Sequence, residues 1–302
     1  MLPKFPEFKK LELSDKADIE RLTFKYDPYS DFNFETMWTW DLNNTVKISE
    51  LHGNLVADLI HPLTNQNVCT YFGNDKVNDT VDNLFSFLKK NRSIRPQLSL
   101  VPEISLLNLD PTKYDTELDL NASDYVYDIL ELSHYLGSKF IKKRNKTNAF
   151  VRQYPNIVSK IINLKNAKER REIYNLDKEW IDKKVKNHSI LDVEKELSVI
   201  NRFLEARFKN ALCVAIYNLK EIIGFSIFSF HSNDYVVSHF TKANTAYKGI
   251  YEFLLRESAS LLNKLGYKFL NHQEDMGLPG LREAKKSYRP VKFLKKYTVT
   301  EK

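Results

Sequence analysis

Glycine is scarce in this 302-residue sequence, and the eight glycines form no phosphate-binding loop. Neither G-x-x-x-x-G-K-S/T nor G-x-G-x-x-G occurs, so nucleotide binding of the P-loop and Rossmann kinds has no support. The two cysteines, Cys69 and Cys213, lie far apart, and neither C-x-x-C nor H-E-x-x-H is present. Structural zinc and zincin chemistry are therefore not expected. Without G-x-S-x-G, a serine hydrolase triad has no support either.

Long apolar runs are also missing. The longest uncharged stretch, residues 59–74, has 16 residues rich in Asn, Thr and Gln, which is shorter than the about 20 apolar residues of a membrane-spanning helix. Residues 1–5 contain no apolar signal core, and the cysteines form no paired motif. We therefore expect a cytoplasmic protein without a transmembrane segment.

Charge is abundant and unevenly placed. The sequence has 46 Lys plus Arg against 39 Asp plus Glu, a net charge of +7. Residues 132–168 contain seven Lys, two Arg and no acidic residue, and residues 282–296 contain five Lys, two Arg and one Glu. Such segments favour a polyanionic partner, either tRNA or an anionic lipid headgroup. The alternative is a solvated helix face whose basic side chains pack over apolar neighbours.

Hydrophobic periodicity predicts the same order of elements twice: strand, two helices, three strands, helix, strand. In the first copy, strands are expected over 8–13, 45–51, 55–60, 67–72 and 97–101, with a helix over 77–90 and a hairpin turn at His52-Gly53-Asn54. In the second copy, strands are expected over 158–164, 211–217, 222–230, 235–240 and 267–270, with turns at 218–220 and 232–234 and a helix over 247–265. A last strand is expected over 292–300.

This order is that of a GNAT acyltransferase domain. The sequence therefore predicts a mixed α/β protein with two tandem GNAT-like domains, residues 1–135 and 136–302, the second preceded by a basic linker helix.

Several longer motifs carry a resemblance to a known family. They are Tyr29-Ser30-Asp31-Phe32-Asn33-Phe34, Asp124-Tyr125-Val126-Tyr127, Lys143-Arg144-Asn145 with Asn148 and Phe150, Asn271 with Glu274-Asp275 and Gly277, and the run 280–290 followed by Lys296-Tyr297. From about residue 8 onward, the chain resembles the soluble proteins, mostly of unknown function, that share the C-terminal domain of phosphatidylglycerol lysyltransferase. His272 and Gln273 depart from the family pattern, in which Arg and Glu are expected.

The resemblance implies a tandem GNAT fold, similar also to the Fem-type transferases that move an amino acid from aminoacyl-tRNA onto an amine or hydroxyl. Such a transfer requires no cofactor. The full-length lysyltransferases join this domain to a membrane-embedded flippase portion, which we do not find in this sequence. Transfer also needs a proton acceptor for the attacking nucleophile. Glu274 and Asp275 are the candidates for the base or for holding the acceptor amine, although Asp275 can instead cap a turn ahead of Gly277. No metal site is expected.

One loop bears on whether the protein can bind coenzyme A. GNAT domains that use acyl-CoA carry roughly R/Q-x-x-G-x-G/A before the main helix, where backbone N–H groups bind pyrophosphate. Here the stretch is Ala246-Tyr247-Lys248-Gly249-Ile250-Tyr251, in which only the central glycine fits. A coenzyme A thioester is therefore possible but disfavoured.

The remaining candidate residues are assigned to substrate binding. Lys242 and Lys248 flank the loop and can contact a phosphate or oxyanion, or can simply be solvated. The aromatic motif near residue 30 can line a cleft or pack in the core, and the two asparagines three apart on the linker helix can recognise a ligand or tie down the linker. The full set is Tyr29, Asp31, Asn33, Lys143, Arg144, Asn145, Asn148, Lys242, Lys248, Asn271, Arg282, Lys285 and Tyr288.

The leading functional hypothesis is an acyltransferase that moves an aminoacyl or acyl group onto an amine or hydroxyl acceptor. One alternative is a non-catalytic basic protein that binds RNA or a membrane surface on the same fold. The others are an acyl-CoA-dependent N-acyltransferase and lysylation of phosphatidylglycerol itself.

Overall fold

The computed structural model describes residues 1–60, 65–91, 95–187, 193–231 and 234–302, and the chain divides into two compact units. Unit 1 comprises residues 1–125, 274–282 and 293–302, and unit 2 comprises residues 126–273 and 283–292. Strands β6 (Tyr114–Asp128) and β12 (Lys292–Glu301) and helix α9 (Pro279–Lys286) therefore contribute residues to both units. The boundary predicted after residue 135 is based on a repeated order of elements. The division into compact units does not test that repeat, so the boundary stays a prediction.

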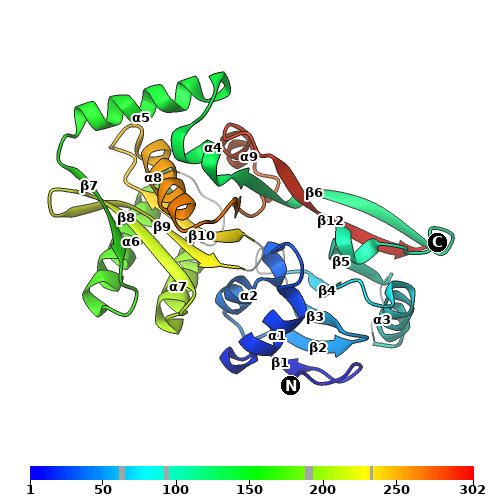
Figure 1. The fold of residues 1–302 in the computed structure, drawn as a ribbon. Helices are drawn as coiled ribbons and strands as arrows, with labels where there is room; N and C mark the ends of the chain where they lie inside the picture. The colour runs from blue at the N-terminus through cyan, green and yellow to red at the C-terminus, as the bar shows by residue number, and fades with distance from the viewer. Residues whose placement is uncertain (61–64, 92–94, 188–192, 232–233) are drawn as a thin grey trace. The chain divides into compact units, whose positions relative to one another are not determined.

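Unit 1 contains the first predicted series of elements in the predicted order (Figure 1). The elements are β1 (Lys9–Lys10), η1 (Leu13–Asp15), α1 (Lys16–Thr23), η2 (Ser30–Phe32), α2 (Phe34–Trp40), β2 (Lys47–Leu51), β3 (Asn54–Ile60), β4 (Asn67–Phe72), α3 (Val77–Asn91), β5 (Gln97–Pro102) and η3 (Glu103–Leu106). Strands β1 to β4 form an antiparallel sheet in sequence order, and β5 pairs with β12. The first strand is only two residues long, shorter than predicted.

The predicted hairpin joins β2 to β3. His52 and Gly53 both have positive φ angles, 53° and 86°, as a two-residue turn that follows the strand twist requires. Leu51 pairs directly with Asn54, so the turn is as tight as the sequence indicated. Two further turns were predicted: the one at 218–220 lies between β8 (Ala211–Asn218) and β9 (Glu221–Phe230), and the one at 232–234 begins with two residues outside the described part of the chain.

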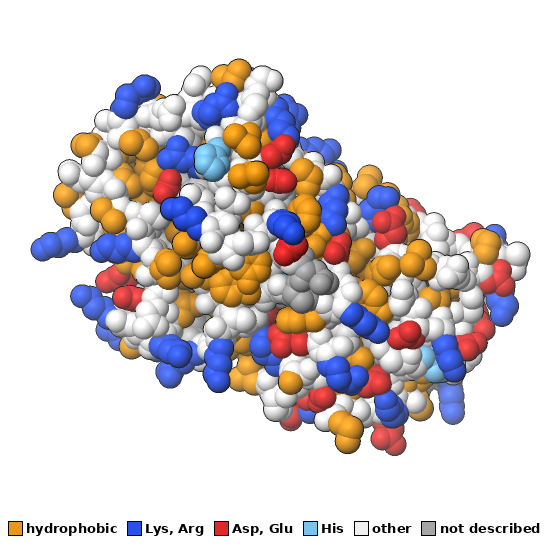
Figure 2. Space-filling model, viewed as in Figure 1, with side chains coloured by type: hydrophobic (Ala, Val, Ile, Leu, Met, Phe, Trp, Pro, Cys, Tyr) orange, Lys and Arg blue, Asp and Glu red, His pale blue; other side chains and the backbone are white. Residues whose placement is uncertain are grey.

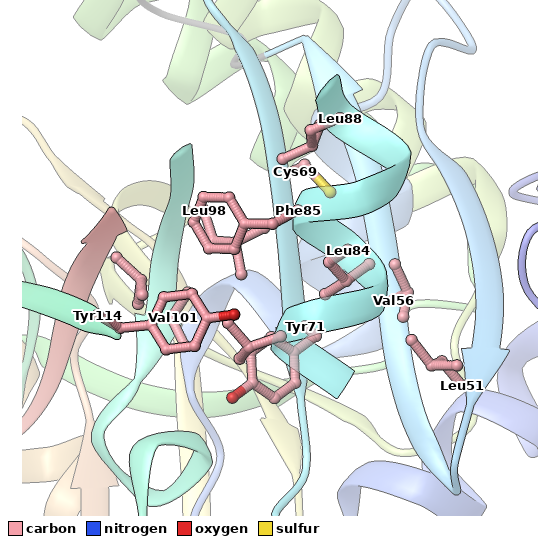
Figure 3. Close-up of a cluster of buried hydrophobic side chains, with 12 residues drawn as sticks. Leu51, Val56, Cys69, Tyr71, Leu84, Phe85, Leu88, Leu98, Val101 and Tyr114 are labelled. Atoms are coloured by element: carbon pink, nitrogen blue, oxygen red, sulfur yellow. The ribbon is translucent and has the colours of Figure 1, made fainter. Parts of the chain in front are cut away.

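The core of unit 1 follows from the alternation of side chains along its strands. Val56 and Tyr71 lie in a cluster with Leu84, Phe85 and Leu88 of α3, as Figure 3 shows. The next residue on β4 points to the other face of the sheet, where the ring of Phe72 stacks on Phe32 at a centroid distance of 4.9 Å. Helices therefore cover both faces of this sheet.

Unit 2 contains the second predicted series. Its elements are α4 (Ile129–His134), η4 (Ser138–Phe140), α5 (Ile141–Gln153), β7 (Ile157–Ile162), α6 (Ala167–Asn187), α7 (Val193–Ala206), β8 (Ala211–Asn218), β9 (Glu221–Phe230), β10 (Tyr235–Ala243), α8 (Ile250–Lys264) and β11 (Phe269–Asn271). From the end of β6, its strands lie in the order β6, β11, β10, β9, β8, β7, and only the β10–β11 pair is parallel. Helix α8 covers one face of these strands, and α6 and α7 cover the other (Figure 1).

Both units thus have the predicted GNAT-type order within a mixed α/β fold. The sequence patterns missed most of β6, because residues 115–122 are largely polar and exposed, and they missed the short helix α9. Among the described residues, no helix combines the length and the apolar character needed to cross a bilayer.

Candidate active site

Strand β12 places a lysine inside unit 1. Lys296 lies two residues after Leu294, so both side chains point to the same face of the strand, and both are buried. The lysine side chain has no exposed surface. Lys296 is absent from the predicted site residues, although its parity with Leu294 is a signal in the sequence that marks it as inward-facing.

Three groups from distant parts of the sequence surround the ammonium of Lys296. Its Nζ donates to Oδ1 of Asp124 on β6 at 2.8 Å and to Oγ of Ser30 at 2.9 Å, and it forms an ion pair with Asp31. Burial alone lowers the pKa of a lysine, but the carboxylates of Asp124, Asp31 and Glu274 outweigh it and raise the pKa of Lys296 well above its ordinary value. These carboxylates therefore favour the ammonium form of Lys296 over the neutral amine.

Asp124 also fixes the backbone of η2. Its Oδ2 accepts the N–H of Ser30 at 2.7 Å, and its Oδ1 accepts the Ser30 hydroxyl at 2.7 Å. Asp124 is completely buried, and these donors and Lys296 replace the water that its oxygens lose on burial. Residues 30 and 31 are held in place by a strand more than ninety positions further along the sequence.

Glu274 joins the same network from the segment that follows β11. Its Oε2 lies 3.3 Å from Oγ of Ser30. The Glu274 side chain is partly exposed, and the side chain of Asp31 is 27% exposed, whereas Asp124 and Lys296 are closed to solvent. Glu274 and Asp31 are therefore the two carboxylates of this network that a ligand can reach.

Asp275 has a different environment from its neighbour. Arg282 binds both of its oxygens, each at 2.8 Å, Tyr125 donates its hydroxyl at 2.5 Å, and the N–H of Gly277 donates at 2.8 Å. Burial raises the pKa of this carboxyl, but the arginine, tyrosine and backbone donors lower it further, to about 2. A carboxylate so fully hydrogen-bonded is a poor base, and its bond to the Gly277 N–H is the turn-capping role given above as the alternative.

The partners of Asp275 are fixed in turn. Arg282 also donates to Oδ1 of Asn121 at 2.6 Å, so its guanidinium, predicted to bind substrate, is engaged within unit 1. Burial and the neighbouring carboxylate raise the pKa of Tyr125 to about 12. These hydrogen bonds hold the loop that follows Glu274 against strand β6.

In unit 2, the predicted residues near the end of β11 stabilise their own loop. Lys285 is buried and donates to the carbonyl oxygens of His272 and Gln273, at 2.5 and 3.2 Å. Asn271 accepts the N–H of Gln273 at 2.7 Å, and the Gln273 side chain donates to the Ser238 carbonyl of β10 at 2.8 Å. Burial and the Lys285 charge lower the pKa of His272 to about 3, so this imidazole is neutral at physiological pH.

The basic linker helix is α5, and some of its cations are already paired. Lys143 and Lys146 lie 3.4 and 3.0 Å from Oε1 of Glu252 on α8. Lys143 also lies 3.7 Å from the ring centre of the largely buried Tyr288. Arg144 donates to the carbonyls of Tyr135 and Gly137. Of these predicted binding residues, Lys143, Arg144 and Tyr288 therefore have structural partners.

The outward face of α5 is different. Lys142, Asn145, Asn148 and Arg152 are exposed, and residues 142, 145, 148 and 152 share one side of a helix. In the view of Figure 2, Lys and Arg side chains outnumber acidic ones where α5 lies in Figure 1. The two asparagines predicted to act together are available for a ligand.

Around the loop before α8, Lys242 and Gly249 have structural roles, whereas Lys248 faces solvent. Lys242 is buried, forms an ion pair with Glu196, and lies 3.7 Å from the ring centre of Trp180. Gly249 has φ +92°, and a Cβ there would lie 3.0 Å from the carbonyl oxygen of Lys146. Lys248 is exposed. Helix α5 thus packs against the helix start where pyrophosphate binds in acyl-CoA enzymes.

The early aromatic motif divides between structure and the network. Tyr29 is buried, with its ring 5.6 Å from that of Phe72. Asn33 begins α2 by accepting the Thr36 N–H at 3.1 Å. Only Asp31 of the three predicted residues in this motif reaches the Lys296 network.

The fold is acyltransferase-like, with GNAT-type element order in each unit. The chain belongs to the family of the C-terminal domain of phosphatidylglycerol lysyltransferase, whose model matches residues 29–300. The resemblance seen in the sequence is therefore confirmed.

Individual relatives share the fold at low sequence identity. A conserved protein of unknown function from Bacteroides thetaiotaomicron has a TM-score of 0.86 at 24% identity, with 100% of both chains covered. The C-terminal domain of a proposed lysylphosphatidylglycerol synthetase from Agrobacterium fabrum has a TM-score of 0.65 at 12% identity, covering 96% of this chain and 92% of that one. An uncharacterised protein of Mycoplasmoides gallisepticum is 27% identical over 190 residues, 62% of this chain. The match spans 59% of the length of that relative.

Proposed function

We propose that the protein transfers an acyl group, specifically an aminoacyl group, from an activated ester to an amine or hydroxyl acceptor, with Glu274 as the general base. Family membership supports the reaction class. The observation that carries the choice of base is the contrast between neighbouring carboxylates: Glu274 is partly exposed beside Ser30, whereas Asp275 is saturated with donors.

The reaction requires two proton transfers, one from the attacking acceptor and one to the leaving alkoxide. The acceptor nitrogen or oxygen attacks the donor carbonyl while Glu274 takes its proton, the ester C–O bond breaks, and the departing alkoxide receives a proton. Asp31, held beside Lys296, is the second carboxylate near the base and is suited to hold the ammonium form of an amine acceptor.

Aminoacyl-tRNA is the donor that we propose. This choice agrees with the cytoplasmic location that we expect for the protein. The exposed cations and amides on α5 supply phosphate and hydrogen-bonding contacts for an RNA. An acyl-CoA donor is disfavoured because α5 packs against the start of α8, where the carbonyl of Lys146 lies 3.0 Å from the Cβ position of Gly249. Phosphatidylglycerol remains one acceptor to be tested.

The test is transfer of a labelled amino acid from aminoacyl-tRNA to amine, hydroxyl and phosphatidylglycerol acceptors. Glu274→Gln should lower transfer by about 100-fold or more, as loss of a general base does, with an unchanged melting temperature. Glu283→Gln, which alters an exposed carboxylate on α9, is the matched control and should retain full activity. An active Glu274→Gln enzyme would exclude this base.

A second candidate function is RNA binding without catalysis, favoured by the exposed basic and amide face of α5. It predicts that tRNA binds with a strong dependence on salt while none of the acceptors receives an amino acid. Binding of acetyl-CoA, measured by a thermal shift, would instead support the acyl-CoA alternative.

A further inference from the structure

The buried lysine of unit 1 is engaged by its neighbours. Its Nζ donates to Asp124 and Ser30 and forms an ion pair with Asp31. Its side chain is closed to solvent, and the surrounding carboxylates raise its pKa. Because a nucleophilic lysine must be deprotonated and accessible, Lys296 does not attack a substrate.

Of the groups in the Lys296 network, only Asp31 and Glu274 are partly exposed, and Ser30 links Glu274 to the lysine. Ser30 accepts a hydrogen bond from Lys296 at 2.9 Å and has one proton of its own, for which Asp124 at 2.7 Å and Glu274 at 3.3 Å compete. One hydroxyl proton cannot satisfy both carboxylates. The charge of Lys296 is therefore what allows three carboxylates to share this space.

We infer that Lys296 is a positioning residue, which holds Asp31 directly and Glu274 through Ser30 in the orientation that transfer requires. The inference rests on the proposed function, in which Glu274 is the base. It adds that Lys296, which has no access to substrate, contributes to the rate of the chemical step by orienting the base.

The experiment compares two adjacent lysines of β12. Lys296→Met should lower kcat by about 100-fold or more, because the base is misplaced. The KM for the aminoacyl donor should stay within about twofold of the wild-type value, since the change also misplaces Asp31, which is proposed to contact the acceptor and not the donor. Lys295→Met is the matched control: Lys295 is exposed, and its partner is Glu103 at 2.9 Å. A Lys296→Met enzyme with unchanged kcat, or with only a raised KM, would overturn the positioning role.

Loss of Lys296 alone removes the cation that pairs with the buried Asp124, which can unfold the protein. The Lys296→Met/Asp124→Asn double variant removes both charges and keeps side chains of similar size, so it should fold and still have a low kcat. Full activity in this variant would also overturn the inference.

Amide hydrogen exchange separates this inference from the proposed function. Positioning predicts faster exchange over residues 28–34 and 274–277 in the double variant than in Asp124→Asn alone, without change over α3, and no such effect in Lys295→Met. If the wild-type protein transfers nothing but these segments still loosen, the proposed function fails and the positioning of the two carboxylates stands. Unchanged exchange would show that Lys296 does not hold them, whatever the activity.

Discussion

Gly249 shows how one residue can match a motif for a different physical reason. It is the one position of the loop before α8 that fits the coenzyme A pattern. Its backbone has φ +92°, and a side-chain methyl group at this position would meet the carbonyl oxygen of Lys146 on α5 at 3.0 Å. The glycine is therefore required by a left-handed backbone and by the close packing of α5.

Gly249→Ala should destabilise the protein by about 1–2 kcal/mol, because alanine is strained at this φ and has no room. Gly280→Ala is the control: Gly280 lies in helix α9 with nothing within 4 Å of its Cβ position. There alanine should be neutral or stabilising by up to about 1 kcal/mol. Urea unfolding of both variants provides the measurement, and equal effects would contradict the packing argument.

At the scale of single elements, α5 combines two roles. Lys143 and Lys146 pair with Glu252 of α8, which lies in the first turn of that helix. Its outward face presents Lys142, Asn145, Asn148 and Arg152. A basic segment read from the sequence therefore separates, in the structure, into cations that hold the unit together and cations that face solvent.

Lys142→Ala/Arg152→Ala should weaken tRNA binding and reduce the slope of log K against log salt by about 0.9 for each phosphate that the protein no longer neutralises. The control is Lys165→Ala/Lys168→Ala, which removes two exposed lysines of the same basic segment outside α5. Filter binding over a range of salt concentrations distinguishes the pairs. Equal weakening in both would indicate diffuse electrostatic attraction and no RNA site on α5.

The elements that the sequence predicts well are those with a strong local signal. Helix α3 and strand β4 have the expected limits within one or two residues, because their apolar periodicity is regular and glycine or polar residues flank them. Strand β6 has no such pattern over 115–122, since its residues there face solvent. Its pairing is set by distant strands, which a local pattern does not contain.

The candidate site was predictable only in part, for the same reason. Glu274 and Asp31 were found from their motifs, but the sequence does not show that they share the Ser30 and Lys296 network. The separate roles of Glu274 and Asp275 depend on Arg282, Tyr125 and the Gly277 N–H. Adjacent carboxylates look equivalent in a sequence, and only their three-dimensional donors distinguish them.

At the scale of the whole molecule, the two units are interleaved in sequence. Unit 1 includes residues 274–282, which lie between the two segments of unit 2, and residues 293–302, which follow the second segment. Val299 of this late segment lies in the unit 1 core, and Lys296 neutralises Asp124. The first 135 residues therefore lack part of their own core.

A fragment of residues 1–135 should not fold cooperatively, because Asp124 and Asp31 would lose their cation and the core would lose Val299. Residues 1–125 joined by a flexible linker to residues 274–302 should regain a cooperative thermal transition. Circular dichroism of both fragments makes the comparison. A well-folded 1–135 fragment would show that the late segment is dispensable for unit 1.

The late position of Lys296 also has a consequence for synthesis on the ribosome. Domains generally fold as they emerge, the N-terminal one first. Here Asp31 and Asp124 are made long before Lys296, with all of residues 126–273 translated in between. Unit 2 can begin to fold before Lys296 of unit 1 has been synthesised. Unit 1 is therefore the first unit to begin translation and the last to be completed.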